Sequence, residues 1–208
     1  TGKQARGKLI NNLIKLSEDE KVSTIIKVRA HDEDNRELFF ITKKGIVKKT
    51  EARLFFHINK NGIRALTLKG EDELTYVGLT SGTKKNEVFI ATRAGFAIRF
   101  SEEDVRSMGR TAAGVKGINL RKDDFVVSAA IVNPETDLDK LSVLTITDEG
   151  YGKRTSLKEY KVQTRGGKGI INLKVNDKTG KIVDVKIVDN ETEIMLITSE
   201  GTLIRTKV

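Results

Sequence analysis

The sequence lacks cysteine and tryptophan, and its 208 residues include one proline and two histidines. Without cysteine the chain forms no disulfide and offers no thiolate to a metal, which fits a reducing compartment. His31 and His57 stand in no metal-ligand spacing, so we expect surface or partly packed roles for them. The apolar runs are far too short to cross a bilayer, and residues 1–3 show no sign of a signal peptide.

A catalytic constellation is also missing from the sequence. Residues 109–116 imitate a nucleotide-binding Walker loop, but Val115 stands where the lysine is required. The carboxylates form runs of like charge in expected turns, a pattern typical of solvated surface rather than of an acid/base pair. We therefore expect neither an active site nor a metal or cofactor in this chain.

A long internal repeat is the most informative feature that is present. Four apolar runs each end in a basic hairpin in which a threonine precedes a glycine by three residues. The pairs are Thr42/Gly45, Thr92/Gly95, Thr147/Gly150 and Thr198/Gly201. The glycines are 50, 55 and 51 residues apart, a period typical of radially repeated β-structure. We expect each glycine to supply a positive φ where the ladder reverses, and each threonine to sit at an edge-facing strand position.

A second motif, glycine followed six residues later by leucine, repeats out of phase with the hairpins. Its copies, each with a basic residue within two positions of the glycine, are Gly7/Leu13, Gly62/Leu68, Gly114/Leu120 and Gly167/Leu173. Acidic turns follow and open further strands, so that one period holds roughly four strands. This organisation predicts a single all-β domain over residues 1–208, with repeats at roughly 1–54, 55–106, 107–158 and 159–208. Because the chain starts without methionine part way through a repeat, we interpret it as a fragment.

Runs rich in valine and isoleucine predict individual strands at residues 22–28, 126–132 and 182–188. Helical signal is weak and confined to linkers. In one of these linkers, Ser101 is placed to cap a short turn that begins at Glu102.

The net charge of +9 is concentrated in two segments. Residues 106–122 hold five basic and no acidic residues, and residues 151–173 hold six basic residues against Glu159. If the repeats are arranged radially, equivalent loops align their cations along one rim, which suits a bent polyanion. Charge alone leaves nucleic-acid binding and an ordinary basic surface about equally favoured. Single strands are the less favoured ligand, because they call for aromatic stacking and the aromatic fraction is 5%.

Three segments resemble the C-terminal domain of the A subunit of DNA gyrase: residues 108–118 (MGRTAAGVKGI), 151–155 (YGKRT) and 163–169 (QTRGGKG). The similarity runs over essentially the whole chain. It implies a β-pinwheel, a propeller-like disc of four-stranded blades that exchange strands and wrap duplex DNA around a basic rim. In that family the wrap supports ATP-dependent negative supercoiling. Four repeats against the usual six blades imply a disc that lacks the first blade and the last.

The resemblance also identifies candidate DNA contacts. The family's box motif, Gln-Arg-Arg-Gly-Gly-Lys/Arg-Gly, matches residues 163–169 except that Thr164 replaces an arginine, and here it lies in the last repeat instead of the first. This box-like motif consists of Gln163, Thr164, Arg165, Gly166, Gly167, Lys168 and Gly169. We expect phosphate contacts from Arg110, Lys116, Arg165 and Lys168, an extension of the track by Lys153, Arg154, Lys158 and Lys161, and further contacts from Arg6, Lys8 and Arg64. Little sequence specificity is expected, because wrapping reads charge and deformability.

The partners that the resemblance implies are duplex DNA, the remainder of the A subunit of gyrase, and the B subunit. The nucleophilic tyrosine, the metal site and the ATPase would lie in those other parts of a cytoplasmic, chromosome-associated enzyme with no membrane contact. Two alternatives stay open: the equivalent domain of topoisomerase IV, and a propeller-like protein-interaction module with incidental basicity. A strong chiral wrap of relaxed plasmid distinguishes gyrase from topoisomerase IV, and a lack of duplex affinity at low salt favours the interaction module.

Overall fold

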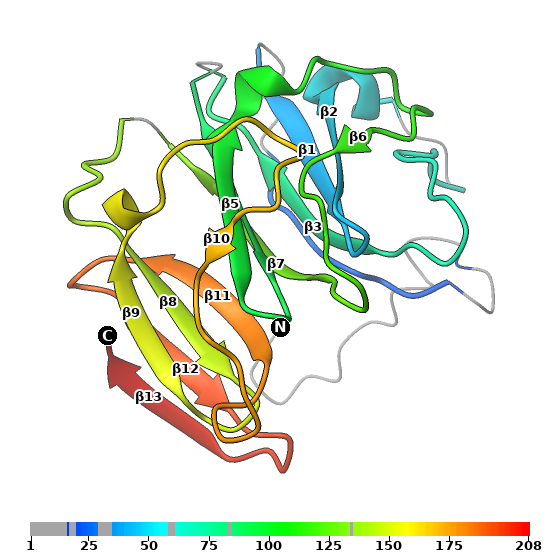
Figure 1. Ribbon diagram of the computed structural model, residues 1–208. Helices are drawn as coiled ribbons and strands as arrows, with labels where there is room; N and C mark the ends of the chain where they lie inside the picture. Colours follow the sequence, from blue (N-terminus) through cyan, green and yellow to red (C-terminus); the bar gives the residue numbers. More distant parts are fainter. Residues whose placement is uncertain (1–15, 17–19, 29–34, 58–60, 83–84, 134) are drawn as a thin grey trace, which may run out of the picture.

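The computed structural model describes residues 16, 20–28, 35–57, 61–82, 85–133 and 135–208. This part of the chain is almost entirely β-structure, arranged in four antiparallel sheets that follow one another in a fan (Figure 1). The strands are β1 (Glu37–Thr42), β2 (Ile46–Glu51), β3 (Leu74–Leu79), β4 (Glu87–Thr92), β5 (Phe96–Ser101), β6 (Val115–Lys116), β7 (Val126–Val132), β8 (Ser142–Thr147), β9 (Gly152–Ser156), β10 (Ile170–Ile171), β11 (Ile182–Val188), β12 (Glu193–Ile197) and β13 (Leu203–Lys207). The expected all-β class and the strands at 126–132 and 182–188 are confirmed.

Helix is confined, within the described residues, to three short 3₁₀ turns: η2 (Ala52–Phe55), η3 (Glu102–Asp104) and η4 (Leu157–Glu159). Ser101 caps η3 as expected, since its side chain accepts a hydrogen bond from the Glu103 N–H at 3.2 Å. Each turn directly follows a hairpin and bends the chain away from the sheet it has just left.

The sheets share strands between repeats, which is the exchange that the resemblance implies. The first sheet has the order β3-β1-β2-β6 and the second β10-β5-β4-β7, so that each outer strand comes from a later repeat. The third sheet, β11-β8-β9, and the fourth, β12-β13, have three and two strands. In the two four-stranded sheets the outer strand begins 69 or 74 residues after the hairpin strand with which it pairs.

The four hairpins have the predicted glycine geometry. Gly45, Gly95, Gly150 and Gly201 have φ values of 77°, 92°, 78° and 85°, a region that residues with a Cβ avoid. The threonines differ from the expectation of an edge-facing position, because Thr42, Thr92 and Thr147 are buried. Their hydroxyls, like that of Thr198, accept the backbone N–H four residues later and so close the turn from inside. A buried hydroxyl needs such a partner.

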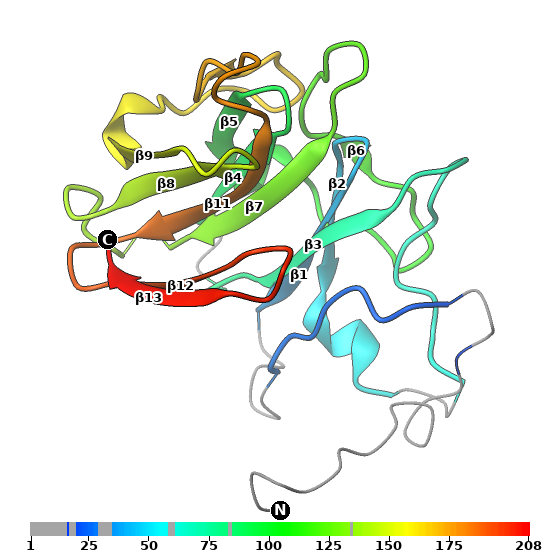
Figure 2. The ribbon, with the colours of Figure 1, turned by 90° about the horizontal axis from the view of Figure 1, so that it is seen from below.

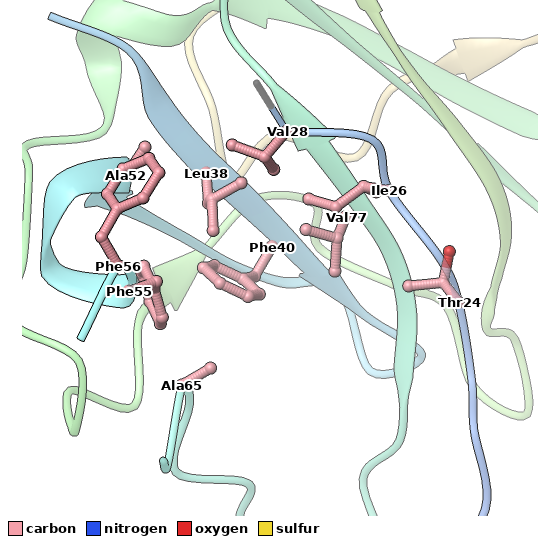
Figure 3. Close-up of a pocket in the computed structure, with 10 residues that line it drawn as sticks. All are labelled: Thr24, Ile26, Val28, Leu38, Phe40, Ala52, Phe55, Phe56, Ala65 and Val77. Carbon is pink, nitrogen blue, oxygen red and sulfur yellow. The ribbon is translucent and has the colours of Figure 1, made fainter. Parts of the chain in front are cut away.

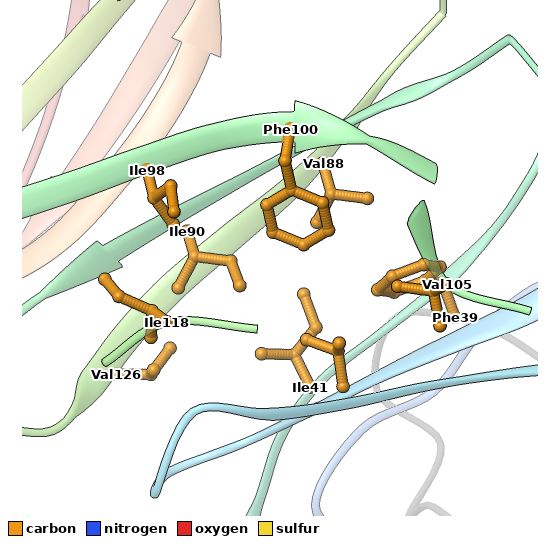
Figure 4. Close-up of a cluster of buried hydrophobic side chains, with 10 residues drawn as sticks. Phe39, Ile41, Val88, Ile90, Ile98, Phe100, Val105, Ile118 and Val126 are labelled. Carbon is orange, nitrogen blue, oxygen red and sulfur yellow. The ribbon is translucent and has the colours of Figure 1, made fainter. Parts of the chain in front are cut away.

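Apolar side chains from adjacent sheets form the core. Phe39 and Ile41 of β1 face Val88 and Ile90 of β4 in the cluster between the first two sheets (Figure 4). A second cluster joins the second and third sheets through residues such as Phe89. Each large side chain buried in this way contributes about 1.5–3 kcal/mol. Apolar contacts between sheets, together with the strands that the repeats share, therefore hold the repeats together.

The inner strands of successive sheets meet on one side of the molecule. Strand β7 lies against both β3 and β11 (Figure 2), whereas the two-residue strands β6 and β10 lie at the opposite edge of their sheets. The first three sheets thus have a common centre and an outer edge, as a radial arrangement requires.

Residues 22–28 do not form the expected strand. Their sequence is rich in strand-forming residues, and Ile26 packs against the same apolar cluster as side chains of β3. Their described hydrogen bond to β3 is the one from Ser23 Oγ to Leu74 O at 3.0 Å, and no ladder forms. The inner strands β3, β7 and β11 begin 37, 39 and 40 residues after the hairpin strand that they pair with. No described strand pairs with residues 22–28 as β1, β4 and β8 pair with these inner strands, so residues 22–28 join no ladder within the described part of the chain.

Two acidic turns have a structural use that differs from the expectation of solvated surface. Asp72 Oδ1 accepts the Lys44 N–H at 2.9 Å, and Asp124 Oδ1 accepts the Ala94 N–H at 2.8 Å. Each carboxylate therefore caps the tip of the preceding hairpin. The expectation was wrong at these two positions, because local charge does not show which backbone donors a side chain meets after folding.

Candidate nucleic-acid interface

Three glycine-containing loops follow one another along the outer edge, and we call them the rim loops: residues 61–68, 109–119 and 163–169. Thr67 of the first loop donates from its backbone N–H to Ala112 O at 3.4 Å. Asn119 N–H of the second loop donates to Gly167 O at 2.8 Å, and Gly166 N–H of the third donates back to Gly117 O at 2.6 Å. Loops from three repeats are therefore in direct contact in series.

Each later rim loop is attached, at its end or directly after it, to the hairpin of the repeat two before its own. The N–H groups of Gly117 and Ile118 point to the carbonyl of Gly45, and those of Asn172 and Leu173 point to the carbonyl of Gly95. These matched bonds define which loop positions are equivalent. The matched pairs are Arg110 with Arg165, Gly114 with Gly169, and Lys116 with Ile171.

This register corrects the sequence alignment of the glycine-to-leucine motif in its last copy. Spacing pairs Gly167/Leu173 with Gly114/Leu120, which is two residues out of step with the structure. The box-like motif contains three glycines, and spacing alone does not tell which of them takes the positive φ beside the neighbouring strand. Gly169 does so: its φ is 67°, and an added Cβ would meet the carbonyl group of Ala97.

Most of the predicted cations lie on the surface of this edge or next to it. Arg6 and Lys8 fall outside the described residues. Of the others, Arg110 and Arg165 are partly buried, and the exposed ones are Arg64, Lys116, Lys153, Arg154, Lys158, Lys161 and Lys168. The side chains of Arg64, Lys161 and Lys168 make no hydrogen bond or ion pair within the described part of the chain, so their charges face solvent.

Several predicted cations are already engaged with protein groups. Lys158 forms an ion pair with Asp139, and Lys153 Nζ donates to Asn172 O at 3.3 Å. Lys116 Nζ is 3.5 Å from Asn119 Oδ1 within its own rim loop. The contact of Lys116 is long and exposed, and phosphate could replace it, whereas the carboxylate beside Lys158 offsets that cation.

Arg154 belongs to a series of cations that link one sheet to the next. We call these the connectors, defined as the residue four positions after each hairpin glycine. The first three of the four donate to the carbonyl seven positions after the next hairpin glycine. The bonds are Lys49 Nζ to Glu102 O at 3.2 Å, Arg99 Nη1 to Leu157 O at 3.0 Å and Arg154 Nη1 to Val208 O at 3.4 Å. Lys49 and Arg99 are buried and also pair with Glu37 and Glu87.

Two further cations that sequence reasoning did not single out lie beside the rim loops. The Arg121 guanidinium lies 3.1 Å from the centre of the Phe96 ring and donates to Lys168 O at 3.0 Å. Lys48 is buried, and its Nζ contacts the carbonyls of Ala65 and Arg110. Burial, aided by the nearby positive charge of Arg110, lowers the pKa of Lys48 to about 8. Both belong to basic patterns in the sequence, but their partners come from other repeats.

An apolar pocket of about 430 Å³ lies on the open face of the first sheet (Figure 3). Side chains from residues 24–28, β1, η2 and β3 line it, including Ile26, Phe40 and Phe55. Leu38 and Phe40 correspond to Val88 and Ile90, which pack on the preceding sheet in the next repeat. With no charged side chain in its lining, the pocket has the character of a sheet-packing face and not of a reaction site.

The described residues offer neither a metal site nor a membrane span. No group of three or more histidine, cysteine or carboxylate side chains with metal-binding geometry occurs among them. In the same part of the chain no helix has the length and apolar character needed to cross a membrane.

Comparison with known proteins gives a consistent relationship. The profile of a family described as "DNA gyrase C-terminal domain, beta-propeller" matches residues 1–29, 36–81, 86–133, 142–189 and 192–208. The A subunit of DNA gyrase from Lawsonia intracellularis is 45% identical over 98% of this chain, and that from Salmonella typhimurium is 43% identical over 98%. The chain covers 24% and 22% of those two proteins, about a quarter of their length.

Solved structures agree with the sequence relationship. The C-terminal domain of DNA topoisomerase IV superposes with a TM-score of 0.86 at 30% identity, covering 97% of this chain and 61% of that one. A DNA gyrase A C-terminal domain superposes with a TM-score of 0.82 at 26% identity, covering 98% and 66%. The strand-sharing sheets, the rim loops and the sequence relationship lead to one conclusion: this chain belongs to the DNA gyrase C-terminal domain family of β-propellers.

Proposed function

We propose that this chain binds duplex DNA without sequence specificity and bends it around the rim loops, in support of ATP-dependent negative supercoiling by a parent DNA gyrase. The observation that carries the proposal is the series of hydrogen bonds between rim loops. Because these loops touch, exposed cations far apart in the sequence lie along one edge. The cations that we propose as direct phosphate contacts are Arg64, Arg110, Lys116, Lys161 and Lys168.

The physical basis is electrostatic. Each phosphate that a cation neutralises releases condensed counter-ions and adds about −0.9 to the slope of log K against log salt for duplex DNA. Bending 20 to 30 base pairs costs on the order of several kcal/mol, so several spaced cations must act together. A series of loops on a common edge meets this requirement, whereas one isolated basic patch does not.

The relatives also suggest the biological setting. Their names identify them as the A subunit of DNA gyrase, so we propose that residues 1–208 form one domain of such a protein. This domain would act beside the rest of the A subunit together with the B subunit. ATP and Mg²⁺ would be used in those other parts, and the complex would work on the chromosome in the cytoplasm.

Binding of a fluorescent duplex, measured over a range of salt concentrations, tests the proposal. Substituting Lys116→Gln together with Lys168→Gln should weaken binding about equally for unrelated sequences and flatten the salt slope by up to about 1.8. Lys186→Gln is the matched control, since Lys186 is an exposed lysine on the inner strand β11, paired with Asp184. Unchanged binding in the double variant would place the contacts elsewhere, and no affinity at low salt would favour the protein-interaction module.

A further inference from the structure

Arg165, the arginine of the box-like motif, uses its side chain within the protein. Its Nε donates to Asp104 O at 2.8 Å, and its Nη1 donates to Lys116 O at 3.0 Å. Its backbone N–H also points to Asp104 Oδ2 at 3.3 Å. The guanidinium thus bridges the last residue of η3 and the preceding rim loop.

Arg110 holds the matching position in the previous rim loop and is used differently. Its guanidinium makes no hydrogen bond or ion pair with any other described residue. Two arginines at one repeat position therefore differ in whether their donors are occupied. Only the donors of Arg110 are fully available to a phosphate.

We infer that Arg165 is a positioning residue that fastens the box-like loop to the preceding rim loop, and that Arg110 is the direct phosphate contact of this pair. This inference rests on the proposed DNA binding. The planar guanidinium can donate to two carbonyls in fixed directions at once, which an ammonium group on a flexible stem does less well. Arg165 holds the backbone of Lys116, while Arg121 holds the backbone of Lys168.

The first pair of rim loops supports this reading, because a different cation does the fastening there. Lys48 contacts carbonyls of both adjoining loops, those of Ala65 and Arg110. In the next repeat the position of Lys48 is occupied by Ile98, which has no donor. Each contact between rim loops thus has a cation that bridges to backbone carbonyls, Lys48 in the first and Arg165 in the second, where Arg121 adds its bond to Lys168 O. Arg110 is released from that task because Lys48 performs it.

Charge-conserving substitutions separate the two roles. The four variants are Arg165→Lys, Arg165→Gln, Arg110→Lys and Arg110→Gln. We expect Arg165→Lys and Arg165→Gln to weaken duplex binding to a similar degree, about tenfold, because both lose the two-carbonyl bridge. Arg110→Lys should bind like the unchanged protein, and Arg110→Gln should lower the salt slope by about 0.9.

A measurement without DNA gives an independent readout. The Gly166 N–H donates to Gly117 O beside the bridge, so its hydrogen exchange should speed up in Arg165→Lys and stay unchanged in Arg110→Gln. Normal binding by Arg165→Lys, with a reduced salt slope in Arg165→Gln, would show that Arg165 contacts phosphate and would overturn the inference. Unchanged hydrogen exchange of the Gly166 N–H in Arg165→Lys would also overturn the inference. If the unchanged protein does not bind duplex DNA, the proposed function fails. The exchange result still shows whether Arg165 fastens the box-like loop to the preceding rim loop.

Discussion

Gly95 and Gly150 occupy the same position in two hairpins but have different surroundings. Both have positive φ, 92° and 78°. A Cβ at Gly95 would collide with the carbonyl of Leu173, which belongs to the segment that follows the box-like loop, whereas a Cβ at Gly150 would meet no atom within 4 Å. Substitutions at these two positions therefore distinguish the cost of backbone strain from the cost of a steric collision with a neighbouring segment.

We predict that Gly150→Ala costs about 1 kcal/mol of unfolding free energy, from strain alone. Gly95→Ala should cost about 3 kcal/mol or more, because the strand must move away from a rigid backbone carbonyl. Urea unfolding of the two variants measures the difference. Equal costs would mean that the segment around Leu173 can move away from the hairpin at little cost.

Glu102 has surroundings that disfavour its charged form. Its carboxylate is fully buried between the first two sheets and accepts no hydrogen bond of normal geometry within the described part of the chain. Burial raises the pKa of Glu102, an effect that the nearby Asn86 and the Lys49 ammonium oppose in part. The corresponding residues in the other repeats are the apolar Ala52 and Leu157, so no carboxylate is required at this position.

The direction of this pKa shift sets a pH dependence. Because the folded protein holds the Glu102 proton more tightly than the unfolded chain, stability should fall as pH rises from the unfolded pKa near 4.5 through the higher folded value. Glu102→Gln should remove that part of the fall and be more stable near neutral pH. Urea midpoints measured from acid to neutral pH test this prediction, and parallel curves for the two proteins would contradict it.

At the scale of elements, the connectors determine how one sheet joins the next. Arg99 lies on β5, pairs with Glu87 on β4 and reaches the carbonyls of Leu157 and Tyr160 around η4. One side chain thus closes a hairpin and holds the turn of the next repeat. Arg205, the fourth copy, makes the first contact with Glu193 and is exposed.

We predict that Arg99→Met costs about 3–5 kcal/mol, because Glu87 loses its partner and two carbonyls lose their donor. The matched change Arg205→Met should cost at most about 1 kcal/mol, as for an exposed ion pair. Thermal and urea unfolding of both variants measure the contrast. A small loss in Arg99→Met would show that apolar packing alone holds the second and third sheets together.

At the scale of the whole molecule, the length of the curved outer edge depends on the number of sheets that share a centre. Three sheets meet through their inner strands, and the β12-β13 hairpin follows with much of its apolar surface exposed. This arrangement offers a short arc of rim loops. The solved relatives are longer, since the chain covers 61% and 66% of the two that we compared.

We therefore predict that the 208-residue chain binds duplex DNA but shifts the topology of relaxed plasmid only weakly. A short arc supplies the cations for binding but bends too few base pairs to offset the elastic cost of a full wrap. Plasmid relaxed by a topoisomerase in the presence of the chain gives the measurement. A strong chiral shift would contradict the prediction and show that the described loops suffice.

The period of about 50 residues, the hairpin glycines and the β-branched runs are local signals, and from them the sequence by itself determined the all-β class, the hairpins and the strands β7 and β11. It also determined that positive charge is concentrated in residues 106–122 and 151–173, the segments that contain the second and third rim loops. It failed for residues 22–28, because a strand needs a partner as well as propensity.

Only the tertiary structure decided which cations are free and which are fastened. Lys48, Arg99 and Arg165 look like Arg110 and Lys168 in the sequence, since all are basic residues near glycines. Their roles differ because a long cationic side chain donates to whichever carbonyl the neighbouring repeat brings within reach. That carbonyl lies 17 to 62 residues away in the chain, a separation over which spacing carries no information about contact.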